Sequence, residues 1–407
     1  MSLGDFPRWC VINAFFIIVF DSFGMFWKSS GEAYLPNYDF YHNLSTMSEW
    51  LRHFSGQYSE FVDIELQYRS RLGLSQYVVH LTNLSHHNQN SMDTRSRLLL
   101  SFGEHAAEFF PVQSMFYLLD NITKGFDFSP RSFEGRFTRF VLNNFDLYLV
   151  TILNPDGRML IERTKDHCWI GTVNNVDLNA DFGDKESSRS MAEPECRVIR
   201  NLVSQKQFDA VISFHSGQRK IFFPLVEEKE KMPNLKHVQH LASAMSNSVM
   251  PQYSVVPLKT TPSAGSIFSY AANEREIAFA YKISMWENKK KRRRNYDQGC
   301  FSAFNPMSEN LQVELEAVYP LYSTLFNYLH FWKRSQLFAE SQEIEDTKRS
   351  RLSLRTVLFF MMASISAYFI CKRSVPFSFK INYRRRGRIV SLKSLRTLFA
   401  LFNFPKM

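Results

Sequence analysis

The feature that most constrains the fold is an alternation between short apolar runs and longer amphipathic segments, which extends from residue 37 to residue 333. The short runs have the length of β-strands, and the longer segments have the apolar spacing of helices. This alternation is typical of an α/β protein with a mostly parallel or mixed sheet. No Pro-, Gly- or Ser-rich linker divides the stretch, so we expect one globular domain. The predicted strands are 62–68, 77–81, 98–102, 147–153, 210–214 and 277–283, and the predicted helices are 105–121, 194–204, 235–248 and 311–329.

Two helices carry start signals. Thr46 and Glu49 have the spacing of a capping box, which predicts a helix with Met47, Trp50, Leu51 and Phe54 on its apolar face. Pro194 has the typical place of a first helical residue.

The charge of the chain argues against nucleic acid as a partner. The 407 residues carry a formal net charge of +10, which by itself would fit a nucleic-acid-binding protein. Ten Lys and Arg residues, with no Asp or Glu, lie between 372 and 407 and account for this whole excess. The remainder of the chain is neutral, so we expect no binding of nucleic acid.

The two ends of the chain predict targeting and anchoring. Residues 9–20 form an uncharged run of 12 residues, which fits a signal peptide at 1–22; a buried N-terminal helix is the alternative. Residues 356–371 form a second uncharged run with a basic residue on each side. Sixteen residues are short for a span, but flanking cations can snorkel to the interface. We predict a single transmembrane helix there, with a buried C-terminal helix as the alternative.

The predicted membrane anchor indicates where the stalk, the basic tail and the globular domain lie. Residues 334–355 are polar and form a stalk, and the basic tail at 372–407 is cytoplasmic by the positive-inside rule. The domain at 37–333 is then lumenal or extracellular, in the secretory pathway or at the cell surface. The glycosylation sequons at Asn43, Asn83 and Asn121 fit this placement.

Three candidate metal ligands follow two of the predicted strands. His105 and Glu108 follow the run 97–102, and His215 follows the run 208–214. Residues three apart share one face of a helix, so we expect the side chains of His105 and Glu108 to lie on one helical face and to converge on one cation. Open α/β sheets bind their ligands at the carboxyl ends of the strands. Three N and O ligands with one open position are typical of a catalytic zinc site, so the sequence predicts one zinc ion per chain.

The cysteines take no part in this site. Two of the five lie in the apolar ends of the chain, and no CxxC spacing exists. The other three, Cys168, Cys196 and Cys300, permit one disulfide and one free thiol, without indicating which pair is joined.

Five sequence blocks resemble, in order and spacing, the carboxypeptidase A-type (funnelin) zinc metallocarboxypeptidases. They are SFGEHAAEFFPV (101–112), TILNPDGR (151–158), CWIGTVNNVDLNADFG (168–183), SMAEPECRVIRNLV (190–203) and VISFHSGQRKIFFP (211–224). A sixth block, GCFSAFNPM (299–307), resembles one found in some branches. The chain is identified as a divergent member, which implies an α/β fold with a mixed, mostly parallel eight-stranded sheet flanked by helices. The resemblance also implies zinc bound by His105, Glu108 and His215, substrate contacts from Asn179 and Ile267, and hydrolysis of peptide C-termini by zinc-activated water.

Two arginines of the family are absent. Ala180 replaces the arginine that binds the terminal carboxylate of the substrate, and Ile170 replaces the arginine that stabilises the oxyanion. Alanine cannot replace a bidentate arginine–carboxylate contact, and loss of one oxyanion donor typically slows catalysis about 100- to 1000-fold. Thr260 stands in an ungapped alignment where the family has a substrate-capping tyrosine.

The general base has two candidates. An ungapped count places Lys282 at that position, which would abolish the base, whereas a short insertion aligns Glu287 with it; we favour Glu287. Three functions follow: an active carboxypeptidase, a catalytically impaired membrane protein that binds peptides or partners, and a zinc deacylase, which the blocks at 190–203 and 299–307 disfavour. Arg158 and Arg219 are candidates to replace the missing cations.

Overall fold

The computed structural model describes residues 36–86, 94–183, 191–225, 234–259, 265–288 and 299–374. The chain forms two units, from Met1 to Phe338 and from Ala339 to Met407. The first unit contains the whole sheet, and the described part of the second is helical. The predicted signal peptide, Thr260 and the tail from residue 375 onward lie outside the described residues.

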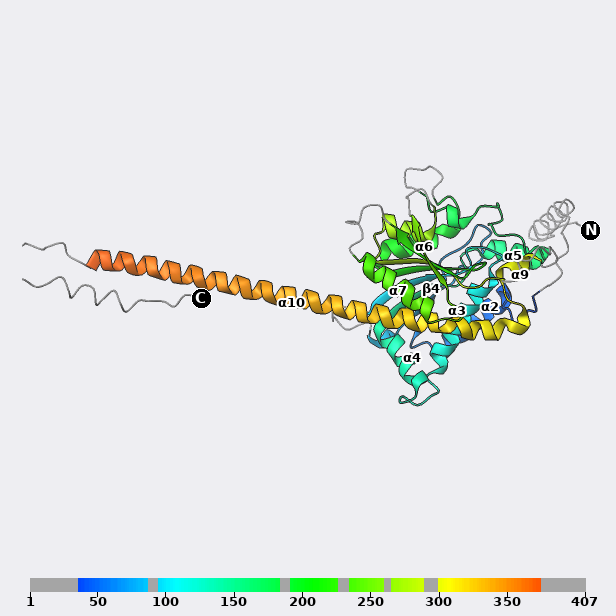
Figure 1. The fold of residues 1–407 in the computed structure, drawn as a ribbon, viewed down its shortest axis with the longest axis horizontal. Coiled ribbons are helices and arrows are strands. Elements are labelled where there is room, and N and C mark those ends of the chain that lie inside the picture. Colours follow the sequence, from blue (N-terminus) through cyan, green and yellow to red (C-terminus); the bar gives the residue numbers. More distant parts are fainter. Residues whose placement is uncertain are drawn as a thin grey trace, which may run out of the picture. The chain divides into compact units, whose positions relative to one another are not determined.

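The centre of the first unit is a mixed sheet of eight strands (Figure 1). The strands are β1 (Val62–Glu65), β2 (Val78–Leu81), β3 (Ser96–Ser101), β4 (Phe145–Val150), β5 (Ala210–His215), β6 (Lys220–Leu225), β7 (Ser254–Lys259) and β8 (Phe279–Ser284). Their order is β1-β2-β4-β3-β5-β8-β6-β7. The central strands β4, β3, β5 and β8 are parallel, and antiparallel pairs join β1, β2 and β6 to them. The expected mixed, mostly parallel sheet is confirmed.

Alternate side chains of the strands build two hydrophobic cores, because successive residues of a strand point to opposite faces. In β3, Leu98 and Leu100 belong to one core and Leu99 to the other. The first core is covered by α2 (Leu44–Gln57), α3 (Phe109–Lys124), α4 (Phe133–Asn144), α5 (Pro155–Thr164), α7 (Leu235–Asn247), α9 (Cys300–Phe304) and the first part of α10 (Leu311–Ser374). The second core is covered by α6 (Arg197–Gln205) and α8 (Ile267–Ser269).

Six strands match the six predicted segments, with shifted ends, and two strands escaped prediction. These two, β6 and β7, each contain a proline, Pro224 and Pro257 respectively. A proline within an apolar run argues against a central strand. The structure accommodates both, because β7 is an edge strand and β6 pairs with β8 only up to Phe222.

Two predicted helix starts are wrong. The N-cap of α2 is Asn43, whose side chain accepts the N–H of Thr46 at 2.9 Å, so Thr46 lies within the helix. The helix predicted to start at residue 105 starts at Phe109, because the chain first makes a turn. The segment predicted to start with Pro194 begins as a short 3-10 turn, Pro194–Cys196, and continues as α6.

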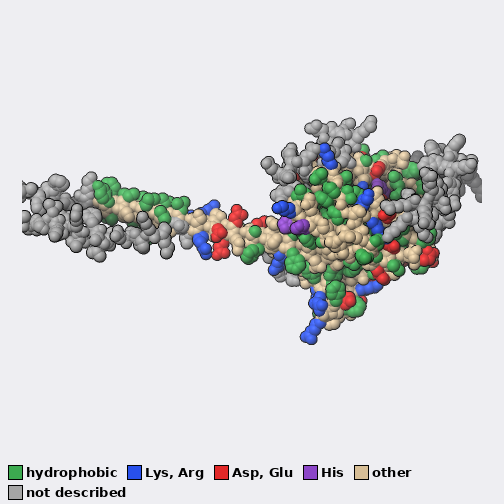
Figure 2. Space-filling view, viewed as in Figure 1, with side chains coloured by type: hydrophobic (Ala, Val, Ile, Leu, Met, Phe, Trp, Pro, Cys, Tyr) green, Lys and Arg blue, Asp and Glu red, His purple; other side chains and the backbone are tan. Residues whose placement is uncertain are grey.

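The helix α10 continues through the predicted stalk and span. Large apolar side chains from Val357 to Ile370 are exposed along it (Figure 2). Among the described residues it is the one helix long and apolar enough to cross a membrane, with a mean hydropathy of 1.5 in its apolar window and none of that window buried. Length and composition therefore fit a span.

Candidate metal centre

The turn between β3 and α3 carries two of the predicted ligands. Gly103 has a φ of +65°, a conformation that other residues rarely adopt, and a Cβ there would lie 2.9 Å from Cγ1 of Ile152. Glu108 is the N-cap of α3, and its N–H donates to the carbonyl of His105 at 3.1 Å. A turn thus brings His105 and Glu108 together, and the prediction that they share a helical face is wrong.

The three predicted ligands converge. Nδ1 of His105 lies 3.0 Å from Oε1 of Glu108, and Nδ1 of His215 lies 3.1 Å from Oε2 of the same carboxylate. One ligand atom from each residue lies within 4.8 Å of the others, and no second such group was found in the described part of the chain. The His215 side chain comes from the last residue of β5, which is paired with β3. Two imidazoles and a carboxylate fit Zn²⁺.

The imidazole of His105 is held on its other side by Asp177, because Nε2 lies 3.0 Å from Oδ1 of that carboxylate. Burial lowers the pKa of His105, but the carboxylates of Glu108 and Asp177 outweigh it and raise the pKa to about 10. Burial raises the pKa of Glu108, but His105 and His215 outweigh it and hold this pKa below its ordinary value. The metal-free site is therefore a compact ion-paired cluster, and a bound cation would displace the proton of His105.

The imidazole of His215 has a different set of partners. Its Nε2 lies 2.7 Å from Oγ of Ser213 and 3.4 Å from Oε2 of Glu104. The hydroxyl of Ser213 donates to the other carboxylate oxygen of Glu104, which is completely buried. Sequence reasoning missed Glu104 and Ser213, although each lies within two residues of a predicted ligand.

Two buried polar side chains hold the ligand turn. Arg158 donates from Nε to the carbonyl of Ala106 at 3.1 Å and from Nη2 to that of Glu108 at 3.2 Å. Its guanidinium lies 3.4 Å from the ring centroid of Phe109. Asn305 accepts the N–H of Phe109 at 2.7 Å, one of the first N–H groups of α3, which have no partner within the helix. Arg158 therefore supports the turn, and two of the motif blocks, NPDGR and FNPM, contribute to it.

The positions of the two missing arginines lie close to the ligand turn. The side chain of Ile170 is 39% exposed, and its carbonyl accepts the N–H of Ala106 at 2.9 Å. Ala180 is exposed and Asn179 is half-buried, in the short turn that follows Asp177. Arg219 forms an ion pair with Glu314 instead, with 2.6 Å between Nη2 and Oε2.

Ile267, the second predicted substrate contact, is completely buried in the second core. The neighbouring Gly265 packs so closely on Ala180 that a Cβ would lie 2.4 Å from the Ala180 carbonyl oxygen. Its φ of +67° also favours glycine. This segment therefore supports the turn of Ala180 by backbone contact.

Lys282, the ungapped candidate for the base position, lies within β8 in register with Ser213 of β5. Paired residues of parallel strands point to the same face, and Ser213 shares its face with His215. The pKa of Asp177 lies below its ordinary value, mainly through the hydrogen bond of His105 and partly through the positive charge of Lys282. The lysine therefore belongs to the electrostatic surroundings of the metal cluster.

Glu287, the favoured candidate, lies three residues beyond the end of β8 and is exposed. The N–H of Met285 donates to the carbonyl of His215 at 2.9 Å, so the segment that leads to Glu287 starts beside a ligand. Lys282 thus lies within β8, which is paired with the strand of His215, and Glu287 follows two residues after the contact of Met285 with His215.

A disulfide joins Cys168 to Cys300, across 132 residues of sequence, and Cys196 is free and buried. The disulfide ties the loop that carries Ile170 to the start of α9.

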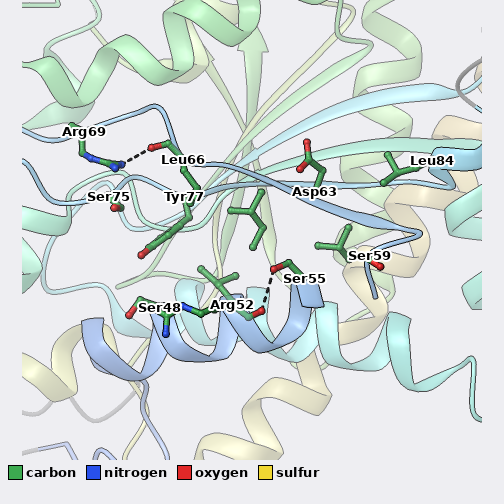
Figure 3. A pocket seen from close by; sticks show the side chains of 13 residues that line it. Ser48, Arg52, Ser55, Ser59, Asp63, Leu66, Arg69, Ser75, Tyr77 and Leu84 are labelled. Atoms are coloured by element: carbon green, nitrogen blue, oxygen red, sulfur yellow. Dashed lines mark hydrogen bonds between the residues drawn. The ribbon is translucent and has the colours of Figure 1, made fainter. Parts of the chain in front are cut away.

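A separate groove of about 590 Å³ lies between α2 and β1, with Arg52, Asp63 and Arg69 among its lining residues (Figure 3). None of its lining residues belongs to the metal cluster.

Comparison with known proteins identifies the family of this chain. Residues 47–318 match the family model described as zinc carboxypeptidase. This chain belongs to the zinc carboxypeptidase family. It is 22% identical to human carboxypeptidase O over 280 residues, which cover 61% of this chain and 71% of the relative. It is 23% identical to human carboxypeptidase A6 over 279 residues, which cover 61% of each protein.

Solved structures agree on the fold. Carboxypeptidase A from Helicoverpa armigera matches with a TM-score of 0.57 at 14% identity, over 74% of this chain and 77% of that one. The bovine thrombin-activatable fibrinolysis inhibitor matches with a TM-score of 0.55 at 15% identity, over 72% and 98%. At such low identity these structures establish the zinc carboxypeptidase fold and nothing finer.

Proposed function

We propose that this chain is a zinc-binding, carboxypeptidase-like membrane protein that binds peptide C-termini and hydrolyses them weakly or not at all. The observation that carries the proposal is the convergence of His105, Glu108 and His215. On the neighbouring strand β8, the residue in register with Ser213 is Lys282 and not a carboxylate. The proposal thus separates metal binding from catalysis.

Zinc would be held by the Nδ1 atoms of His105 and His215 and by the carboxylate of Glu108. When bound, zinc supplies Lewis-acid chemistry that polarises a carbonyl oxygen. Two further side chains hold the imidazole ligands in place. Asp177 lies 3.0 Å from the second nitrogen of His105, and Ser213 lies 2.7 Å from that of His215. Such outer partners orient the ligands.

Three side chains argue for weak hydrolysis. Ile170 and Ala180 offer no donor to a developing oxyanion or to a terminal carboxylate. The ammonium of Lys282 has three donors and no acceptor, so it cannot take a proton as a general base. The same ammonium attracts anions, and we assign it to the terminal carboxylate of a bound peptide.

The second candidate function is active hydrolysis with Glu287 as the general base. The hydrogen bond from Met285 to the carbonyl of His215 favours it, because it anchors the segment leading to Glu287 beside the cluster. In that case Glu287 would accept a proton as the scissile carbonyl is attacked and return it to the leaving amine.

We also propose that the enzyme-like domain lies in the lumen or outside the cell, anchored by the end of α10. The exposed apolar side chains of α10 support the anchor. The disulfide supports an oxidising compartment, since disulfides are rare in the cytosol. Carbonate extraction of membranes tests the anchor directly, and complete release into the soluble fraction would contradict it.

The test of function uses the purified full-length chain, loaded with zinc in detergent, and a panel of peptides with different C-terminal residues. Binding and turnover are measured for the wild type and for two variants of matched design, Lys282→Gln and Glu287→Gln. We expect peptide binding with little turnover, weaker binding in Lys282→Gln and no change in Glu287→Gln. Efficient turnover that disappears in Glu287→Gln would establish the second candidate function instead.

A further inference from the structure

A buried chain of polar groups lies behind His215, on the side away from the metal ligands. Nε2 of His215 lies 2.7 Å from Oγ of Ser213, and the hydroxyl of Ser213 donates to Oε1 of Glu104. A hydroxyl has one proton and two lone pairs. Because that proton goes to the carboxylate, Ser213 meets His215 with a lone pair. Nε2 of His215 must therefore carry a proton and donate it to the serine.

We propose that Glu104 and Ser213 form a relay that fixes His215 as its Nε2–H tautomer and thereby keeps Nδ1 free to bind the metal. The imidazole that binds a metal is neutral, with the proton on one nitrogen and the other nitrogen available as the ligand atom. The Nδ1 atom faces Glu108 at 3.1 Å, which is the side of the ligand cluster. The relay thus sets both the identity of the ligating atom and the orientation of the ring.

The comparison with the other histidine ligand supports this role. His105 meets the carboxylate of Asp177 directly, with 3.0 Å between Nε2 and Oδ1. His215 meets a carboxylate through a serine. Each imidazole ligand therefore has its own carboxylate behind it, an arrangement that raises ligand basicity and fixes the ring.

The burial of Glu104 is the second support. The residue has no exposed surface, and its Oε2 has no hydrogen-bond partner among the described residues. Burying a carboxylate with an unsatisfied oxygen costs free energy. That oxygen lies 3.4 Å from Nε2 of His215, so it faces the ring that would share the positive charge of a bound metal. Glu104 is thus placed to stabilise the metal-bound state.

The inference rests on the zinc site of the proposed function and does not require hydrolysis, so zinc affinity is its readout. The full-length protein is titrated with zinc against a chelator for the wild type, Glu104→Gln, Ser213→Ala and Ser213→Thr. Glu195→Gln is the matched control, because Glu195 is also completely buried with one unpartnered oxygen and lies outside the ligand cluster. The thermal midpoint of each metal-free variant is measured in parallel.

We expect Glu104→Gln and Ser213→Ala each to lower zinc affinity about 10- to 100-fold. A variant that combines Glu104→Gln with Ser213→Ala should lose little more zinc affinity than either single variant, because the two residues act in series. Ser213→Thr keeps the hydroxyl and should retain the wild-type affinity, as should Glu195→Gln. This pattern should hold even if the metal-free midpoints differ.

Two results with the variants would overturn the relay. One is wild-type zinc affinity in both Glu104→Gln and Ser213→Ala. The other is an equal loss in Ser213→Ala and Ser213→Thr, which would indicate packing and not the hydroxyl. A wild-type chain that binds zinc and cleaves no peptide leaves the relay intact, whereas efficient cleavage by that chain contradicts only the proposed weak hydrolysis. A wild-type chain that binds no zinc would overturn both.

Discussion

The metal side and the substrate side of the candidate site differ in how their side chains are held. On the metal side, Glu108 and His215 are buried, and each ligand has a hydrogen-bond partner. On the substrate side, Ala180 and Glu287 are exposed and Ile170 is 39% exposed. The two sides also come from different elements. His215 is the last residue of β5, and His105 and Glu108 lie in the turn between β3 and α3, whereas Ile170 and Ala180 lie between α5 and α6 and Glu287 follows β8.

The side chains of Ile170 and Ala180 therefore do not set the geometry of the metal side, which Ile170 contacts through its backbone carbonyl. Arg158 and Asn305 hold the ligand turn from within the core and contact neither Ile170 nor Ala180 in the hydrogen bonds described for them. Substitutions on the substrate side should therefore change catalysis and leave zinc in place.

The largest expected effect is on the metal side. His215→Ala removes an imidazole ligand and should weaken zinc binding more than about 100-fold, beyond the loss typical of an outer partner. Chelator competition measures it. Ile170→Ala is the control on the substrate side and should bind zinc as the wild type does. Unchanged zinc affinity in His215→Ala would show that the metal lies elsewhere.

The next effect is expected on the substrate side, when the two missing arginines are restored. Under the second candidate function, with Glu287 as the base, Ile170→Arg with Ala180→Arg should raise kcat/KM for peptides about 100- to 1000-fold, because an oxyanion donor alone has that value. Ile170→Leu with Ala180→Leu is the matched control. A wild-type chain that already cleaves peptides at the rates usual for this family would show that another cation serves the site.

The disulfide is the covalent link between the sides. Cys168→Ser with Cys300→Ser should lower the free energy of unfolding by about 3–5 kcal/mol, as expected for the opening of a long loop. Denaturant titration of the zinc-free protein measures this, with Cys196→Ala as the control for loss of a buried thiol. If the double variant is as stable as the wild type, the loop of Ile170 is held by other contacts.

The smallest expected effect comes from a carboxylate outside the cluster. Burial, together with repulsion from Asp156 and Glu193, raises the pKa of Glu195 from 4.5 to about 7. Its contribution to stability is therefore full below about pH 4.5 and is lost as the pH rises through 7. Glu195→Gln should reduce the fall of the thermal midpoint over this interval. A steeper fall in the variant would contradict the raised pKa.

The convergence of His105, Glu108 and His215 could be predicted from the sequence, but the backbone geometry that brings them together could not. An apolar run followed by His105, and another followed by His215, indicated two strand ends at one edge of a sheet. The helical face assumed for His105 and Glu108 was wrong, because the positive φ of Gly103 begins a turn that delays the helix to Phe109. A spacing of three residues fits both geometries.

Contacts over long sequence distances were beyond sequence reasoning. Glu104 and Ser213 are 109 residues apart, and only the pairing of β3 with β5 brings them together. The cysteine pair was left open for the same reason. The two missed strands were obscured by their prolines, which the sheet tolerates because β7 is an edge strand and Pro224 of β6 lies beyond its pairing with β8.

X-ray absorption at the zinc edge of the full-length protein reports which atoms surround a bound zinc ion. We expect one zinc ion per chain with only N and O neighbours at about 2.0–2.2 Å, and the scattering pattern of two imidazoles, from His105 and His215. In His215→Ala the signature of one imidazole should be lost. A sulfur neighbour at about 2.3 Å, or a wild-type protein that retains no zinc, would contradict a metal centre built from His105, Glu108 and His215.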